Sequence, residues 1–189
     1  QSRSSAASDV YKRQEIYNAP IPTSHPAFEA AEKTVADRIT RLKNINGKQT
    51  VESFHKRLGK IIWNECGMSR TEAGLKQAIA DVQALKKEFW SDVRIPGEIN
   101  EYNPELDKAN RVADFIELGE LMCVDALARE ESCGGHFREE YQTPEGEALR
   151  DDKNFMYVAA WELKNDHEWT LHKEELKYEV IQPSQRNYK

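Results

Sequence analysis

Apolar residues recur every three or four positions along three long segments of the chain, a spacing typical of helices with one buried face. The segments run over residues 50–66, 69–92 and 103–129. Short connectors join them, so neighbouring helices are expected to be antiparallel. The apolar positions are Val51, Phe54, Leu58, Ile61 and Ile62, then Leu75, Ile79, Val82, Leu85 and Phe89, and finally Leu106, Ala109, Val112, Ile116, Gly119 and Met122.

These helices predict a mainly α protein built on a three-helix up-down-up bundle of the spectrin-repeat kind, in a helical domain at residues 27–130. A further helix at 27–44 precedes the bundle and is expected to lean outside it, with Phe28, Val35 and Leu42 among its apolar positions. Three prolines at residues 20–26 make residues 15–26 an extended connector.

Capping residues locate the helix ends. Thr23 or Ser24 is expected to cap the helix at 27–44, and Asn103 precedes the last helix. Ser69 with Glu72 matches a capping box at the start of the helix at 69–92. Gly47 and Gly67 are expected to end the two helices before them.

The periodicity changes after residue 152, where β-compatible and aromatic residues predict strands. Residues 155–163 and 168–173 are expected to form a hairpin around a turn at Asn165 and Asp166. Residues 176–181 alternate weakly and are a candidate third strand. Residues 131–189 are therefore interpreted as a polar loop followed by a small β tail.

Composition limits the possible partners. The 189 residues carry a net charge of -6, which argues against nucleic acid, because phosphate binding needs clustered Lys and Arg. No apolar run approaches the ~20 residues of a membrane-spanning helix, so direct membrane insertion is not expected. Three widely spaced cysteines suit reduced thiols in the cytoplasm.

Residues 1–14 differ from the rest of the chain. They are small and polar, lack hydrophobic periodicity and resemble translated sequencing-adapter sequence. We interpret them as a non-native or artefactual tail and expect the natural chain to have been truncated near Glu15.

Charge and glycine are concentrated in residues 129–152, hereafter the belt. Three arginines and one histidine lie there among many carboxylates, and a Gly-Gly pair allows positive φ and close approach of another surface. A short chain was expected to supply few partners for these charges. The belt is therefore predicted to dock on a domain outside this chain, through Arg129, Ser132, Gly134, Gly135, His136, Arg138, Arg150, Asp151 and Asp152.

The sequence supports a metal-binding or catalytic role for the belt less well than it supports docking. Cys133 and His136 are possible zinc ligands, but no second pair supplies the other two, and no third group is apparent to orient a nucleophilic thiol. His136 and Arg138 could bind a dicarboxylate. An interdomain network of hydrogen bonds and ion pairs, in which Arg138 and Arg150 bind local carboxylates, is favoured instead. No glycine-rich dinucleotide motif is present. No catalytic, cofactor-binding or metal residue is predicted.

The belt carries a resemblance to a known family. The run Glu131-Ser132-Cys133-Gly134-Gly135-His136-Phe137-Arg138, followed by Arg150-Asp151-Asp152, resembles the C-terminal region of succinate dehydrogenase/fumarate reductase flavoprotein subunits. Cys133 stands where most members carry Arg. Residues 54–61 and 112–122 are similar to the family too, as is the closing Gln185-Arg186-Asn187-Tyr188.

That resemblance implies a fragment of a larger oxidoreductase. The complete subunit would hold FAD, covalently bound to a histidine, and interconvert succinate and fumarate. Electrons would leave through an iron–sulfur subunit and a membrane anchor subunit to quinone, at the cytoplasmic face of the cell membrane. The FAD and substrate sites would lie in the upstream FAD-binding domain, so this fragment is expected to be inactive alone. The alternatives are an L-aspartate oxidase C-terminal domain and a stand-alone helical interaction module.

Overall fold

A computed structural model describes residues 21–181, 183 and 184. The chain separates into two compact units, residues 1–41 and residues 42–189. The interpretation of residues 1–14, most of the proline-rich connector and the closing residues 185–188 all lie outside the described residues. The domain boundaries expected from the sequence, at residues 27–130 and 131–189, remain predictions.

Helix α2 spans Pro26–Ile45 and crosses the boundary between the two units. Its expected cap at Thr23 or Ser24 is wrong: the Ala27 amide donates to Nδ1 of His25 at 3.2 Å, because the helix begins at Pro26. Phe28 and Val35 are exposed, whereas Leu42 is fully buried. Leu42, the buried residue of α2, belongs to the second unit.

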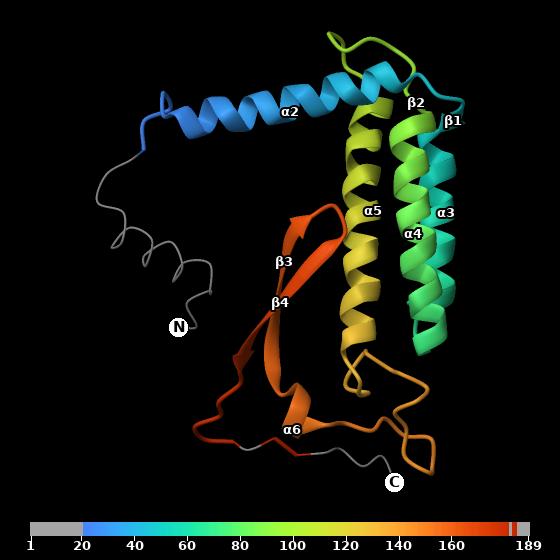
Figure 1. The fold of residues 1–189 in the computed structure, drawn as a ribbon, viewed down its shortest axis with the longest axis vertical. Coiled ribbons are helices and arrows are strands. Elements are labelled where there is room, and N and C mark those ends of the chain that lie inside the picture. Colours follow the sequence, from blue (N-terminus) through green and yellow to red (C-terminus); the bar gives the residue numbers. More distant parts are fainter. Residues whose placement is uncertain (1–20, 182, 185–189) are drawn as a thin grey trace, which may run out of the picture. The chain divides into compact units, whose positions relative to one another are not determined.

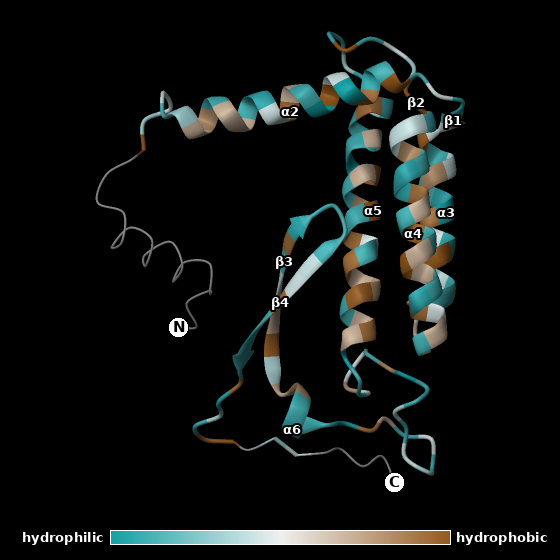
Figure 2. Ribbon diagram, in the orientation of Figure 1, coloured by the Kyte–Doolittle hydropathy of each residue, from teal (hydrophilic) through white to brown (hydrophobic). Residues whose placement is uncertain are grey.

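The three predicted helices form the expected bundle, seen side by side in Figure 1. Helix α3 spans Val51–Glu65, α4 spans Glu72–Asp92 and α5 spans Pro104–Ala128. In the core, the rings of Phe54 and Phe89 meet edge to face, with centroids 5.2 Å apart. Hydrophobic and hydrophilic positions alternate along all three helices (Figure 2), as the periodicity predicts.

Side chains cap each bundle helix at its start. The Thr50 hydroxyl accepts from the Ser53 amide, and the Asn103 side chain accepts from Leu106, as expected for Asn103. The predicted capping box at Ser69 is wrong. Thr71 caps α4 by accepting from the Gly74 amide at 3.0 Å. Ser69 instead donates from its hydroxyl to Glu139 in the belt, at 2.6 Å.

A short parallel pair closes the end of the bundle where α3 begins. Strand β1, Gln49–Thr50, pairs with β2, Val93–Arg94. The Gly47 amide donates to the Val93 carbonyl at 3.0 Å, after Asn46 turns the chain with φ 44. Two-residue strands carry no periodicity, so the sequence analysis missed this sheet.

The β tail is a single hairpin. Strand β3, Tyr157–Asn165, pairs antiparallel with β4, Glu168–Glu175, and a one-turn helix α6, Asp152–Phe155, precedes it. The candidate third strand at 176–181 is wrong, because these residues form no ladder with β3 or β4 in the described structure. Pairing with β3 ends at Glu175, so the weak alternation beyond it has no neighbouring strand.

Buried polar contacts hold the hairpin on α4 and α5. Nδ1 of His167 lies 2.9 Å from the fully buried Glu120 carboxylate, which also accepts from Gln83. Lys86 pairs with Asp166 at 2.8 Å. The hairpin is thereby fixed against the bundle at its turn. No helix in the described part of the chain is long and apolar enough to cross a membrane.

Candidate functional site

The belt begins with a tight turn at its glycine pair. Cys133 and His136 exchange two backbone hydrogen bonds, of 2.8 and 3.0 Å, around Gly134 and Gly135. Gly134 has φ +59, which favours glycine. A Cβ added at either glycine would meet no described atom within 4 Å. The conformation explains Gly134, but no packing inside this chain requires Gly135.

Arg138 is the buried centre of the belt, with 1% of its surface exposed. Its Nη1 donates to the Ala126 and Leu127 carbonyls at 3.0 and 3.2 Å, and Nε donates to Glu140 at 3.1 Å. The last carbonyls of a helix lack intrahelical donors and carry partial negative charge. Arg138 therefore caps the C-terminus of α5 with a charged donor.

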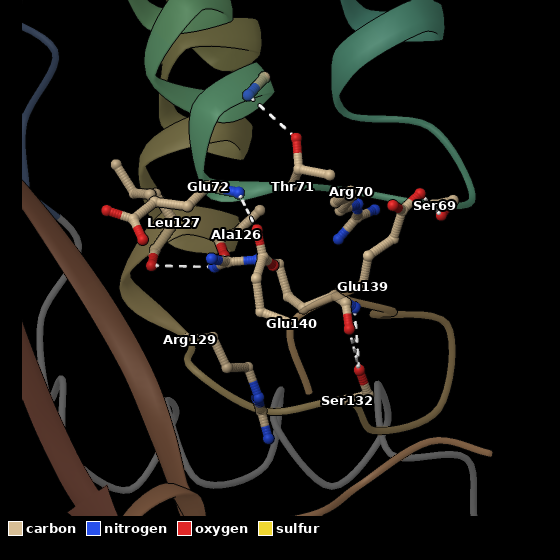
Figure 3. Close-up of polar contacts among 12 residues, drawn as sticks. Ser69, Arg70, Thr71, Glu72, Ala126, Leu127, Arg129, Ser132, Glu139 and Glu140 are labelled. Carbon is tan, nitrogen blue, oxygen red and sulfur yellow. Dashed lines mark hydrogen bonds and ion pairs between the residues drawn. The ribbon is translucent and has the colours of Figure 1, made fainter. Parts of the chain in front are cut away.

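Backbone pairing joins the belt to the α3–α4 connector. The Arg70 amide donates to the Phe137 carbonyl at 3.1 Å, and the Glu139 amide donates to the Arg70 carbonyl at 2.9 Å. Arg138 is also held by Ser132, whose hydroxyl accepts from the Arg138 amide at 2.8 Å. Figure 3 shows Arg70, Ser132 and Glu139 close together below the helix ends. Two stretches that are far apart in the sequence, the α3–α4 connector and the belt, thus close one end of the bundle.

Glu140 links the belt to the start of α4. Its carboxylate accepts from the Glu72 amide at 2.5 Å while pairing with Arg138. Burial opposes the charge on Glu140, but bonds from the Glu72 amide and its own amide, with the Arg138 guanidinium, lower its pKa. A carboxylate at a helix N-terminus is also favoured by the helix dipole.

His136 is held in a defined tautomer. Nη1 of Arg70 lies 2.7 Å from Nδ1 of His136. A guanidinium can only donate, so Nδ1 accepts and Nε2 carries the proton that it donates to the Arg129 carbonyl, at 2.9 Å. Burial first, then the charges of Arg70, Arg129 and Arg138, lower the pKa of His136. The imidazole is therefore neutral near pH 7.

The three belt arginines share one local pattern: each pairs with a carboxylate two residues later. Arg129 binds the buried Glu131 at 2.6 Å, Arg138 binds Glu140, and Arg150 binds Asp152 at 2.5 Å. Side chains two apart in extended backbone lie on the same side. The expected pairing of Arg138 and Arg150 with local carboxylates is confirmed, while the interdomain character of the network stays a prediction.

The premise of the docking prediction is therefore wrong. Each predicted belt charge finds a partner inside the chain: Asp151 caps α6 by accepting from Asn154, and Arg150 also donates to the Ser184 carbonyl at 3.2 Å. The expectation that a short chain cannot supply such partners overlooked the arginine–carboxylate spacing. Docking itself remains a prediction, and it now rests on the turn at Gly134 and Gly135 rather than on unpaired charges.

Among the described residues, no group of three or more His, Cys, Asp or Glu side chains is arranged to hold a metal ion. Cys133 is half-buried in its turn, while Cys66 and Cys123 are buried together in the core. The hydrogen bond that the Cys123 thiol donates to Cys66, and then burial, raise the pKa of Cys123. A buried thiol held in its protonated form is a poor nucleophile.

The sequence analysis missed three contributors to this region: Arg70, Thr71 and Glu72 of the α3–α4 connector. No local pattern marks a connector that lies beside a segment about 65 residues later. The repeated arginine–carboxylate spacing, by contrast, was readable in the sequence.

Comparison with known proteins agrees with this architecture. The family model described as the fumarate reductase flavoprotein C-terminus matches residues 55–188. A solved quinol-fumarate reductase with menaquinol molecules matches with a TM-score of 0.77 and 24% identity, over 94% of this chain and 30% of that chain, which shows a shared fold. The chain therefore has the fold of the C-terminal helical domain of such flavoproteins, and it belongs to the fumarate reductase flavoprotein C-terminal family.

Curated relatives carry the same name. The fumarate reductase flavoprotein subunit of Escherichia coli is 27% identical over 162 residues, which cover 86% of this chain and 26% of the relative. The 8-methylmenaquinol:fumarate reductase flavoprotein subunit of Wolinella succinogenes is 31% identical over 128 residues, covering 62% and 19% respectively. The chain thus spans about a quarter or less of the length of these relatives.

Proposed function

We propose that this chain is the C-terminal part of a flavoprotein subunit that interconverts succinate and fumarate. The observation that carries the proposal is the family match over residues 55–188, supported by the matching fold. The complete subunit would bind FAD in its upstream domain. It would pass electrons through an iron–sulfur subunit and a membrane anchor subunit to quinone, lying peripherally at the inner face of the cell membrane.

Within that subunit, the role of this domain is structural. Its polar side chains are engaged in closing the bundle: Arg138 caps α5, Glu140 binds the start of α4, and His136 is neutral and held at both nitrogens. Groups so constrained are poorly placed to bind substrate or transfer protons. The 189-residue chain alone is therefore expected to bind no flavin and to reduce no fumarate.

Production of the full reading frame together with neighbouring iron–sulfur and anchor subunits tests the activity. We expect a flavin-loaded subunit that oxidises succinate or reduces fumarate with a suitable electron carrier. A full-length subunit that contains no flavin and acts on neither dicarboxylate would overturn the proposal. The 189-residue chain serves as the inactive control.

The belt also supplies a proposed docking point for the upstream domain, the turn at Gly134 and Gly135. An added Cβ at either glycine would meet no described atom, and Gly135 does not have a positive φ. A glycine at position 135 is therefore explained by close approach of another surface, which supports the proposal. In the full subunit, Gly135→Val is expected to lower flavin retention, whereas Glu145→Val in the neighbouring exposed turn is not. Equal flavin content in both variants would count against docking at this turn.

A further inference from the structure

Helix α5 presents three kinds of face. Val112 and Ile116 are buried against the other bundle helices, and Glu120 and Asp125 contact the hairpin. The third face is covered only in part. It exposes 44% of Phe115, 53% of Leu118 and 44% of Met122, which follow one another at helical spacing.

Helix α3 extends this apolar face. The ring of His55 lies 5.9 Å from that of Phe115, and Gly119 faces Leu58 and Ile62, so α3 and α5 are in contact along this side. Trp63, one turn after Gly59 on α3, is 82% exposed. Contiguous exposed apolar side chains on two adjacent helices mark an interaction surface rather than ordinary scatter.

Gly59 is an independent sign of a partner. It lies in the middle of α3, where glycine lowers helix stability relative to alanine. A Cβ added there would meet no described atom within 4 Å. Within the described residues, neither packing nor backbone conformation requires glycine at this position, whereas close approach of another backbone would.

We infer that the face formed by Gly59, Trp63, Phe115, Leu118 and Met122 packs against the upstream part of the same flavoprotein subunit. This inference rests on the proposed function. The family is a C-terminal region, and the chain spans 22% to 26% of its first relatives, so most of the subunit lies N-terminal to it. A covalently tethered surface is present at high effective concentration, which favours it over a separate subunit or a second copy.

Thiol labelling of the full-length subunit tests the assignment. In a Cys133→Ser background, Leu118→Cys introduces one reporter on the face, and Ala80→Cys introduces a control at an exposed position of α4. Labelling rates with a maleimide are divided by those of the same variants unfolded in urea. We expect at least about tenfold protection at position 118 in the flavoprotein subunit alone, and little at position 80.

Each other outcome overturns the assignment. Fast labelling at position 118 in the subunit leaves the face uncovered. Protection that appears only when the iron–sulfur subunit is added names that subunit instead, and protection that rises with protein concentration names a second copy. Equal protection at position 80 removes specificity for the face. Flavin content and fumarate reduction of the same preparations report separately on the proposed function.

Discussion

The two ends of the helical bundle are closed by different means. Where α3 begins, backbone meets backbone: Gly47 packs on Asp92, and strands β1 and β2 pair. Where α5 ends, the buried side chain of Arg138 and its partner Glu140 close the bundle. The first end depends on the absence of a side chain, and the second depends on a charged one.

The difference shows how a polar loop becomes part of a domain. Helix ends leave carbonyls and amides without partners, which must be satisfied when they are covered. At the belt end, Arg138 supplies donors to α5 and Glu140 supplies an acceptor to α4. The belt is thus integral to the bundle, and its three arginines have carboxylate partners within the chain.

The largest effect is expected at the belt end. Arg138→Ala leaves the Ala126 and Leu127 carbonyls covered without a donor and Glu140 without its cation, which should lower the free energy of unfolding by about 3 kcal/mol. Urea unfolding of the 189-residue chain measures this. Arg150→Ala is the matched control, because its carboxylate is also two residues away but the pair is partly exposed; it should cost less than about 1 kcal/mol. Similar losses in the two variants would contradict a special role for Arg138.

At the opposite end, Gly47→Ala is expected to cost about 2 kcal/mol, because overpacking forces the backbone to shift. An added Cβ at Gly47 would lie 2.0 Å from the Asp92 carbonyl carbon. Gly59→Ala is the control, and it should stabilise the chain by up to about 1 kcal/mol, since α3 gains a better helix former. Thermal unfolding of both variants distinguishes them. An unchanged melting temperature for Gly47→Ala would mean that the backbone contact is not tight.

The start of α4 offers a smaller test at the belt end. Thr71→Ala removes the hydroxyl that accepts from Gly74 and should cost about 1 kcal/mol, the usual value of a helix cap. Ser69→Ala removes only an exposed contact with Glu139 and should cost less. If Ser69→Ala proves the more damaging change in urea unfolding, the capping box predicted from the sequence is correct after all.

The smallest effect concerns pH. Because the pKa of His136 is lowered in the folded chain, the unfolded chain takes up a proton first as pH falls below about 6.5. His136 should therefore contribute fully to stability above that pH and lose its contribution below it. His136→Asn is expected to flatten the pH dependence of the unfolding midpoint between pH 7 and 5. An identical slope in the variant would show that other groups set it.

The sequence predicted the bundle well because its three helices carry long, regular apolar stripes. It missed β1 and β2, since two-residue strands have no period, and it placed the start of α4 at Ser69 although Thr71 lies nearer the helix. Charge and a glycine pair drew attention to the belt, whose role as a docking segment stays a prediction. Its partners were not predicted, because the contact between Arg70 and the belt is long-range and no local signal encodes it.

The arginine–carboxylate spacing of the belt teaches a more general lesson. In the sequence, a cluster of charges suggests a partner outside the chain. In the structure, however, ion pairs form between residues two apart, Arg129 with Glu131 and Arg150 with Asp152. Under the inference above, exposed apolar positions such as Leu118, which is 53% exposed, indicate a missing surface better than the belt charges do. They became visible only once the folded structure showed which faces of α5 are covered.

Native-state amide hydrogen exchange of the 189-residue chain tests the central claim, that the belt is held by its own contacts. The Arg70, Ser132, Arg138 and Glu139 amides all donate hydrogen bonds of 2.8 to 3.1 Å within this network. If the network closes the bundle, these amides exchange as slowly as those in the centres of α4 and α5. Exchange at the rate of an unprotected loop, with the helices still protected, would show that the belt needs a partner from outside the chain.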